Sequence, residues 1–480
     1  MAAHSTHSHF PPAGLPRNLA DLRASGWTST PVTDELRRNA SKRIAAGETL
    51  VPGIMGFEET VVPQLENALL AGHDMILLGE RGQAKTRVIR NLVDLLDEWL
   101  PIVAGSEIND DPYHPVSRYA RVRVAEEGDD TAIDWIHRSD RYGEKLATPD
   151  TSIADLIGEV DPIKVAEGRY LSDELALHYG LVPRVNRGIF AINELPDLAE
   201  RIQVGLLNVL EERDVQIRGH RIRLPLDIVL VATANPEDYT NRGRIITPLK
   251  DRFGAQIRTH YPRETVTEVA IMKSEATLPT DGVPVVVPAF LEEIVAEISQ
   301  LARRSPHLNQ RSGVSVRLSI ANYETLAANA VRRALRTGEP MAVPRVSDLG
   351  ALVTSTQGKV EVEAMEEGHE DEVMAQLVSA AVLSVFRRRV TLEDPGSIVA
   401  AFEGEMVVHA GDDLPSSAYL EVLRDAPALE PPARAIGGLD AQESPALLAS
   451  ALEFLLEGLH LTKRLNKDAS GARALYRSRK

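Results

Sequence analysis

Short apolar runs alternate with helix-like segments between residues 53 and about 262 of the chain. Five of these runs are predicted to be β-strands, and they are MILL (75–78), ARVRV (120–124), GIFAIN (188–193), DIVLVATA (227–234) and AQIRTHY (255–261). A run as continuous as IVLVA is typical of a strand that is buried on both faces, as in a parallel sheet covered by helices. This part of the chain is therefore predicted to be an α/β domain.

The strand pattern largely disappears after residue 262. Apolar residues recur there at intervals of three and four, which is the spacing of amphipathic helices, in segments 290–304, 319–335, 373–389 and 446–465. We expect a helical region over 263–357 and a further helical region over 358–480, and the sequence does not indicate the role of the latter. The basic tail of that region is expected to cap the last helix and then fray.

The first thirty or so residues are polar and rich in Ser, Pro and His, which is typical of a mobile arm. A helix capped by Thr33 is expected next, so residues 1–39 form the arm and the start of a helix, and the α/β core occupies 40–262. The histidines of the arm could hold a metal ion, but a disordered polar tail is the favoured interpretation.

The composition narrows the possible functions. The chain has 480 residues and no cysteine, which excludes disulfides, thiolate metal sites and cysteine nucleophiles. Its formal net charge of −17 argues against non-specific binding of nucleic acid by the whole surface. No segment approaches the roughly 18 apolar residues of a membrane span, and the start lacks a signal-peptide pattern. A soluble cytoplasmic protein is therefore expected.

The segment GERGQAKT (79–86) lies between a predicted strand and a segment with helical spacing. A strand that turns through glycines into a helix offers backbone N–H groups to an anion. Lys85 is expected to reach the β- and γ-phosphates of a nucleotide, and Thr86 to ligate Mg²⁺. Ala84 stands where the G-x-x-x-x-G-K-[ST] pattern has its second glycine, and we expect it to open the helix without a positive φ. The candidate nucleotide-binding residues are Gly79, Glu80, Arg81, Gly82, Gln83, Ala84, Lys85, Thr86 and Arg87.

Two later strands end in polar residues. The strand 188–193 leads into Asn193 and Glu194, where phosphate-loop ATPases carry an Asp that holds Mg²⁺ and a Glu that activates the attacking water. Asn193 keeps an oxygen ligand but brings no charge, so weaker Mg²⁺ binding and slow turnover are expected. Asn235 follows the strand 227–234, at the edge where ligands of open α/β sheets gather. Taken alone, each motif also suits an ordinary strand or turn.

Two arginines complete the series. Arg252 lies in TPLKDRFG, and Arg317 begins a predicted helix in the all-α part. A single arginine is most often a solvated surface charge. Five such features in this order, at the spacing of a domain, instead indicate a nucleotide hydrolase.

In this order the motifs resemble those of the AAA+ ATPases, in the branch that holds the magnesium-chelatase ATPase subunit and the MoxR-type ATPases. The run GERG (79–82) is similar to the chelatase loop, and AKT (84–86) to the MoxR version. TSIADLIGEVD followed by GLVPRVNRGIFAINEL resembles the chelatase arrangement, in which an insertion precedes the second nucleotide motif. The likeness covers residues 53 to 353 and implies an AAA+ core with a parallel sheet and an all-α lid.

The resemblance also implies cofactors and roles. ATP and Mg²⁺ would be bound, with Lys85 and Thr86 as first-motif ligands, Asn193 and Glu194 as the second motif, Asn235 as sensor 1, Arg252 as an arginine finger and Arg317 as sensor 2. A finger that reaches the neighbouring subunit requires a ring, which in this class is most often a hexamer. Because such a finger is worth roughly 10³–10⁵ in turnover, an isolated subunit is expected to be nearly inactive.

The segment ERDVQIRGHRIRLP is predicted to be a β-hairpin with a turn at Gly219-His220. In this branch of AAA+ proteins such a hairpin projects toward the interior of the ring, and its basic residues are Arg218, His220, Arg221 and Arg223. They could grip nucleic acid, bind an acidic partner or simply be solvated. The acidic chain as a whole disfavours nucleic-acid translocation.

Several functions remain open. The leading one is a remodelling or chaperone-like ATPase that acts on a protein partner, and this branch commonly works with a von Willebrand factor A domain on a separate chain. The alternative is the motor subunit of a magnesium chelatase, which would need a separate porphyrin-binding subunit. Asn193 keeps a third possibility open, a nucleotide-dependent scaffold with little hydrolysis. A transcription activator is disfavoured, since the GAFTGA-type loop is absent.

Overall fold

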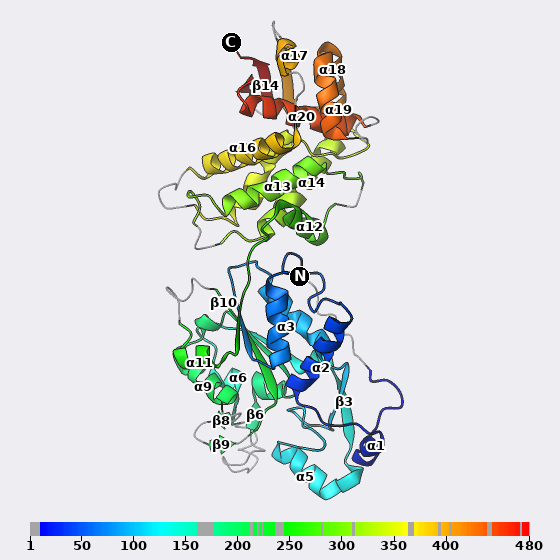
Figure 1. Ribbon diagram of the computed structural model, residues 1–480, viewed down its shortest axis with the longest axis vertical. Coiled ribbons are helices and arrows are strands. Elements are labelled where there is room, and N and C mark those ends of the chain that lie inside the picture. Colours follow the sequence, from blue (N-terminus) through cyan, green and yellow to red (C-terminus); the bar gives the residue numbers. More distant parts are fainter. Residues whose placement is uncertain are drawn as a thin grey trace. The chain divides into compact units, whose positions relative to one another are not determined.

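The computed structural model describes residues 10–160, 177–211, 215–217, 220–222, 224–235, 244–279, 282–309, 313–362, 369–391, 395–402, 406–411, 413–438, 444–470 and 473–479. The chain divides into two compact units, Met1–His260 and Tyr261–Lys480 (Figure 1). No helix in these described segments is long and apolar enough to cross a membrane.

Unit 1 is built around a sheet of five parallel strands in the order β11-β1-β10-β7-β4. The strands are β1 (Met75–Leu78), β4 (Tyr142–Leu146), β7 (Gly188–Asn193), β10 (Ile228–Ala234) and β11 (Ala255–Arg258). Four of them, β1, β7, β10 and β11, confirm predicted strands. The parallel pairing brings all five carboxyl ends to one edge of the sheet, where ligands bind in open α/β folds.

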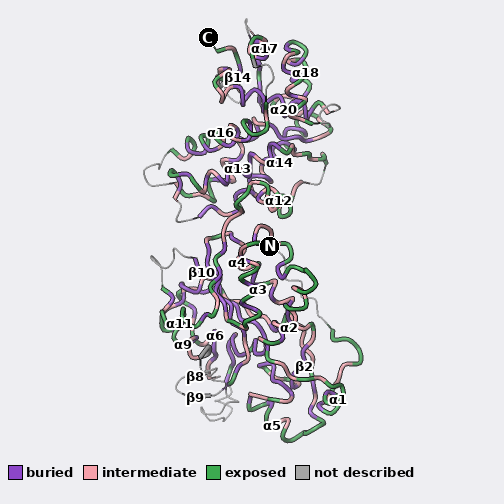
Figure 2. The backbone as a smooth tube through the Cα atoms, viewed as in Figure 1, coloured by how far each residue is buried: buried purple, intermediate pink, exposed green. Residues whose placement is uncertain are grey.

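The two faces of the sheet bury alternate residues of the same strands. Ile189 and Val231 pack in one hydrophobic cluster, whereas Phe190 and Leu230 pack in another. Helices α2 and α3 lie on one side of the sheet, and α9 and α11 lie on the other (Figure 1). The central strands are therefore buried along most of their length, as Figure 2 shows in purple. This confirms the α/β fold class that the apolar runs predict.

The remaining elements of unit 1 surround that sheet. Its helices are α1 (Leu19–Ala24), α2 (Val32–Ala45), α3 (Val61–Ala71), α4 (Lys85–Asn91), α5 (Arg118–Glu127), α6 (Ile153–Leu156), α8 (Leu181–Arg184), α9 (Glu200–Glu211) and α11 (Thr247–Arg252). Three short antiparallel pairs are β2 (Trp99–Val103) with β3 (Ile133–His137), β5 (Gly158–Val160) with β6 (Leu177–Tyr179), and β8 (Val215–Ile217) with β9 (His220–Ile222).

The hairpin β8–β9 confirms the prediction, with one change. Ile217 pairs with His220, so His220 belongs to strand β9 and not to the turn predicted at 219–220. Residues 218–219 and Arg223 lie outside the described residues.

Two local predictions are wrong. The segment 120–124 lies inside helix α5, and Ser117 caps that helix by accepting a hydrogen bond from the Ala120 N–H at 3.1 Å. Ala120 is the one buried residue of α5, so the Arg–Val alternation belongs to an exposed helix and not to a strand. Helix α2 begins at Val32 after Pro31, and Thr33 does not cap it.

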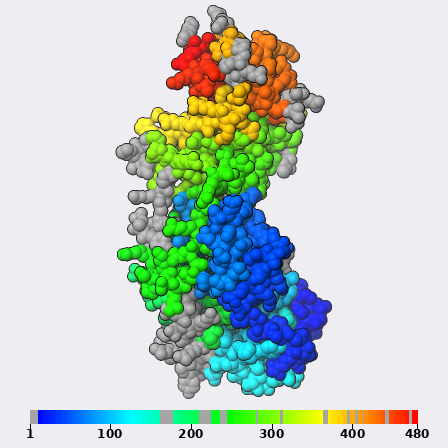
Figure 3. All heavy atoms as spheres, viewed as in Figure 1, coloured from blue at the N-terminus to red at the C-terminus, as the bar shows by residue number. Residues whose placement is uncertain are grey.

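The predicted N-terminal arm is shorter than expected. Residues 1–9, which include the three histidines of the arm, lie outside the described residues. From Asn18 onward the chain packs on unit 1, because Leu19 and Leu22 are buried against Ile133 and Asn18 forms a β-bridge with Ala132. Figure 3 shows these residues in dark blue against the body of unit 1.

Unit 2 is mainly helical. Its helices are α12 (Thr265–Glu275), α13 (Ala289–Ala302), α14 (Arg317–Thr337), α15 (Leu352–Gln357), α16 (Glu370–Arg389), α17 (Pro395–Ala400), α18 (Ser416–Asp425), α19 (Glu430–Gly437) and α20 (Pro445–Leu461). The ring of Phe454 packs against two other rings. Its centroid lies 4.6 Å from that of Phe290 and 5.6 Å from that of Phe386. Residues of the predicted regions 263–357 and 358–480 therefore share one hydrophobic core.

The basic tail is not a frayed helix end. It forms strands β13 (Leu465–Ser470) and β14 (Arg473–Ser478), which join β12 (Val407–Gly411) in an antiparallel sheet of order β12-β14-β13. Tyr476 of β14 is buried and donates a hydrogen bond to Glu457 of α20. The short apolar run ALY between Arg473 and Arg477 is the signal that could have predicted a short strand there.

A buried ion pair ties three elements of unit 1 together. The Arg141 guanidinium donates to both Glu35 carboxylate oxygens, at 2.8 and 2.6 Å, and its Nε donates to the Arg187 carbonyl at 2.8 Å. Glu35 lies on α2, Arg141 immediately precedes β4, and Arg187 immediately precedes β7. The pair therefore fixes where both strands begin relative to the helix that covers them.

We predict that Arg141→Ala lowers the free energy of unfolding of unit 1 by about 3–5 kcal/mol, because Glu35 would stay buried without its cation. Denaturant titration followed by tryptophan fluorescence measures this, since all three tryptophans, Trp27, Trp99 and Trp135, lie in unit 1. Arg23→Ala is the matched control, because its ion pair with Asp129 is exposed, and it should change the value by no more than about 0.5 kcal/mol. Equal effects of the two substitutions would contradict the role given to Arg141.

Candidate functional site

The loop between β1 and α4 is held by contacts with the neighbouring strands. The Gly79 N–H donates to the Ala234 carbonyl at 3.1 Å, and the Gln83 side-chain oxygen accepts from the Glu80 N–H at 3.1 Å and from the Thr259 hydroxyl at 2.8 Å. A Cβ on Gly79 would lie 1.9 Å from the Thr259 hydroxyl oxygen. Glycine is thus required at 79 by close packing, and Gln83 fastens the loop to the end of β11.

Ala84 has φ 55° and ψ 14°, a left-handed backbone conformation immediately before α4. The expectation that it opens the helix without a positive φ is wrong. Glycine adopts this conformation most easily. The Cβ of Ala84 makes it less favourable by about 1–2 kcal/mol. The loop keeps the shape of the glycine-containing pattern in spite of the substitution.

The Lys85 ammonium group is held at the loop itself. It donates hydrogen bonds to the Gly79 carbonyl and, at 2.7 Å, to the Glu80 carbonyl. Its charge thus lies beside the backbone of the loop and not in open solvent.

The carboxyl ends of β7 and β10 meet beside Thr86. The Asn193 side-chain oxygen accepts from the Thr86 hydroxyl at 3.3 Å and from the Thr233 hydroxyl at 3.2 Å. The Glu194 N–H donates to the Thr233 hydroxyl at 3.0 Å, and Glu194 has a left-handed φ of 58°. Residues more than a hundred positions apart in the sequence, Thr86 and Asn193, therefore share one hydrogen-bonded group.

Glu144 of β4 belongs to the same group. The Asn193 amide nitrogen donates to a Glu144 carboxylate oxygen at 2.7 Å, and Arg90 of α4 donates to both of its oxygens, at 2.8 and 3.1 Å. Burial raises the pKa of this carboxyl, but the hydrogen bonds from Arg90, Tyr142 and Asn193 outweigh burial and lower it. Glu144 is thus ionised at neutral pH.

Sequence reasoning missed Glu144 because it missed the strand that carries it. The segment YGEKL is half-buried along the edge of the sheet and contains no apolar run. Glu144 is opposite Ala191 in the register, and its place in the site is recognised only from the contact of its side chain with Asn193.

The sequence matches the family described as Sigma-54 interaction domain over residues 167–252. It is 29% identical over 259 residues to "Magnesium-chelatase subunit ChlI" of Nostoc sp., covering 52% of this chain and 63% of that protein. It is 28% identical over 330 residues to the protein of the same name from Nephroselmis olivacea, covering 63% of this chain and 85% of that one. A third relative, "Magnesium-chelatase 38 kDa subunit" of Cereibacter sphaeroides, is 29% identical over 264 residues, which are 52% of this chain and 69% of that one.

The chain is thus similar to magnesium-chelatase subunits and, over residues 167–252, to the Sigma-54 interaction domain. The likeness to the MoxR-type branch stays a prediction, because the relatives named above are chelatase subunits. In a solved complex of the BchI and BchD subunits of magnesium chelatase, one chain is 22% identical, and the match covers 66% of this chain and 97% of that one with a TM-score of 0.36.

The other candidate residues are spread more widely. Asn235 is buried at the end of β10, and Arg252 is exposed at the end of α11 in unit 1. Arg317 is exposed at the first position of α14 in unit 2. Arg87 lies near Gly53, where an added Cβ would come within 3.1 Å of its guanidinium. The structure thus brings Lys85, Thr86, Asn193 and Glu194 to one edge of the sheet, with Asn235 on the adjacent strand.

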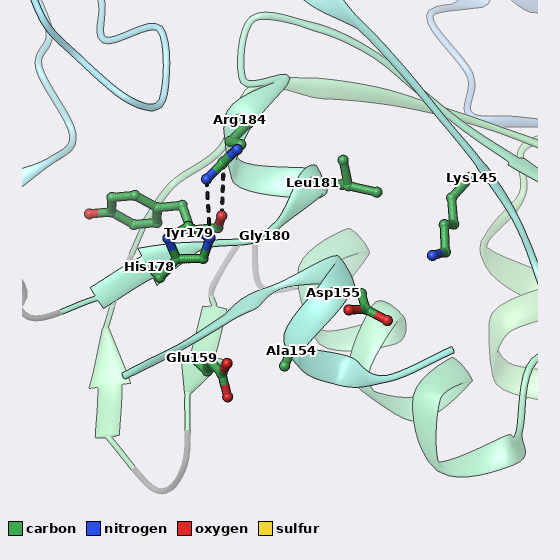
Figure 4. A pocket seen from close by; sticks show the side chains of 9 residues that line it. All are labelled: Lys145, Ala154, Asp155, Glu159, His178, Tyr179, Gly180, Leu181 and Arg184. Atoms are coloured by element: carbon green, nitrogen blue, oxygen red, sulfur yellow. Dashed lines mark hydrogen bonds between the residues drawn. The ribbon is translucent and has the colours of Figure 1, made fainter. Parts of the chain in front are cut away.

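A separate cavity of about 350 Å³ lies on the opposite face of β4. Alternation along the strand turns Lys145 toward it and Glu144 away from it. Figure 4 shows Arg184 beside His178, with Nη2 3.3 Å from the His178 Nε2, and Asp155 on the side of Lys145. The cavity is lined by charges of both signs and by none of the residues 79–86, so it is not part of the phosphate-loop site.

We predict that Ala84→Gly raises the free energy of unfolding of unit 1 by about 1 kcal/mol, because glycine adopts the left-handed conformation without strain. Ala125→Gly, in the exposed part of the ordinary helix α5, should lower it by about 1 kcal/mol. Tryptophan fluorescence during denaturant titration measures both. A loss of stability in both variants would show that residue 84 is not left-handed in solution.

Proposed function

We propose that the protein binds ATP with Mg²⁺ and hydrolyses it within a ring of subunits, so as to remodel or activate a protein partner. The observation that carries the proposal is the hydrogen-bonded group of Thr86, Asn193 and Glu194. Thr86 lies in the first turn of α4, next to Lys85, whose ammonium group contacts the loop. Phosphate-loop ATPases need a lysine, a hydroxyl ligand and a glutamate at one place.

The oxygen atoms present suit a magnesium ion. The Thr86 hydroxyl and the Asn193 amide oxygen lie 3.3 Å apart, and Mg²⁺ prefers oxygen ligands and keeps several of its waters. Neutralisation of phosphate charge is the chemistry that a bound magnesium ion supplies.

The protein side chains would divide the remaining tasks. Lys85 would leave the loop carbonyls and bind the β- and γ-phosphates. Glu194 would orient the attacking water and take its proton, and Asn235 would hydrogen-bond the γ-phosphate or that water. Arg252 would act on the nucleotide of the neighbouring subunit, and Arg317 would act from the lid.

A motor subunit of a magnesium chelatase is the second candidate function, and the similarity to chelatase subunits favours it. In that case a separate chain would bind the porphyrin. The leading proposal instead expects a partner with a von Willebrand factor A domain. The proteins that a Glu194→Gln variant retains in the presence of ATP would distinguish the two.

We predict that Lys85→Ala weakens ATP binding by roughly tenfold or more, because a charge-assisted contact with phosphate is lost. Glu194→Gln should keep ATP binding and lose hydrolysis by about 10²-fold or more. Lys145→Ala is the matched control, since this lysine projects from the other face of the same sheet, and it should retain both activities. Binding of a fluorescent ATP analogue and phosphate release at high protein concentration measure these effects. Equal phosphate release by wild type and Lys85→Ala would contradict the proposal of a motor.

We also predict that mixtures of Arg252→Ala and Glu194→Gln subunits hydrolyse ATP faster than either variant alone. Some interfaces in a mixed ring combine an intact arginine with an intact glutamate, whereas neither uniform ring does. Phosphate release across a series of mixing ratios, with each variant mixed with itself as control, measures this. If no ratio exceeds the two controls, Arg252 does not act on the neighbouring subunit.

A further inference from the structure

Asn193 has two chemically different ends where most phosphate-loop ATPases have two equivalent carboxylate oxygens. An amide offers an acceptor oxygen on one side and two N–H donors on the other. If the nitrogen faced a cation, it would repel the cation and supply no ligand. With asparagine in place of aspartate at 193, the site needs a contact that fixes the orientation of the amide. A carboxylate would need no such contact, because its two oxygens are equivalent.

Three neighbours contact the Asn193 amide in the structure. The hydroxyls of Thr86 and Thr233 lie on the oxygen side, at 3.3 and 3.2 Å, and either hydroxyl could donate or accept. The Glu144 carboxylate lies on the nitrogen side, at 2.7 Å. An ionised carboxylate can only accept, so it is the one contact of the three that excludes the reversed amide.

Glu144 is itself held rigidly. Arg90 donates to both of its oxygens, at 2.8 and 3.1 Å, and the Tyr142 hydroxyl donates to one of them at 2.9 Å. Together with Asn193 these neighbours supply four hydrogen bonds to a side chain that is 21% exposed. The carboxylate therefore has little freedom to turn away from Asn193.

We propose that Glu144 is a positioning residue that orients the Asn193 amide with its oxygen toward Thr86 and the magnesium position; this rests on the proposed function. Glu144 does not replace the missing charge of the aspartate, because Arg90 pairs with it. It makes asparagine usable as an oxygen ligand, so Glu144 and Asn193 work as a matched pair.

If Glu144 orients the Asn193 amide, the effect of a substitution at 193 must depend on the residue at 144. An aspartate at 193 would set a second carboxylate against Glu144, at about the separation now bridged by a hydrogen bond, and like charges at that distance repel strongly. Aspartate would suit the site only if residue 144 could donate. Asn193→Asp should therefore have opposite effects in the wild-type chain and in Glu144→Gln.

The test measures the dissociation constant of a non-hydrolysable ATP analogue with Mg²⁺ and with EDTA, using the full-length chain. The ratio of the two constants is the Mg²⁺ advantage, and it does not depend on hydrolysis. We expect Glu144→Ala to reduce that advantage about tenfold, and the isosteric Glu144→Gln to reduce it several-fold, with little change in EDTA. Lys145→Ala, the neighbouring substitution on the other face of β4, should leave it unchanged.

The double mutant Asn193→Asp with Glu144→Gln tests the positioning role of Glu144 directly. Asn193→Asp should lower the Mg²⁺ advantage in the wild-type chain and raise it in Glu144→Gln, which is a non-additive cycle. Two outcomes would overturn the positioning role of Glu144 and leave the proposed function standing. One is the same effect of Asn193→Asp in the wild-type chain and in Glu144→Gln. The other is an unchanged Mg²⁺ advantage in both Glu144→Ala and Glu144→Gln. A wild-type chain that binds the analogue without any Mg²⁺ advantage would overturn it as well. Failure of the wild-type chain to bind the analogue at all would overturn the proposed function together with it.

Discussion

The buried contact of Arg141 with Glu35 fixes where the edge strand β4 begins, and the arrangement at the other end of that strand depends on it. Arg141 also donates to the carbonyl of Arg187, one residue before β7. A Cβ on Gly188 would lie 1.9 Å from the Arg141 carbonyl oxygen, so the two strands can pair this closely only with glycine there. Three residues after Arg141, the register set in this way brings Glu144 beside Asn193.

Sequence reasoning found the parts of the site that carry a strong local signal. The strands β1, β7 and β10 are continuous apolar runs because both of their faces are buried, and the polar residues that follow them could be located to the position. It missed β4, since an edge strand in contact with solvent needs no apolar run. It misplaced a strand on α5 for the converse reason: the segment 120–124 alternates but lies on an exposed helix.

Backbone conformation was the other feature that sequence reasoning could not supply. Both Ala84 and Glu194 adopt left-handed conformations, which for residues other than glycine cost about 1–3 kcal/mol each and persist only where the surroundings impose them. The surroundings here are two hydrophobic clusters that enclose the sheet and a loop fastened by Gln83 and Thr259. Alanine and glutamate rarely adopt a positive φ, so the local sequence does not predict one at either position. The backbone strain at Ala84 and Glu194 is imposed by the fold.

The charges of the site bear on whether the protein is a motor or a switch. Beside Thr86 and Asn193 lie two cations, Lys85 and Arg90, and two anions, Glu144 and Glu194, whose formal charges cancel. An aspartate in place of Asn193 would add one negative charge next to the phosphates. Without it, bound phosphates would meet less repulsion, and Glu144 would have no second carboxylate beside it. Under the proposed function, the missing charge at 193 would favour retention of ATP over rapid turnover, and the contact with Glu144 would keep the amide oxygen available to the metal.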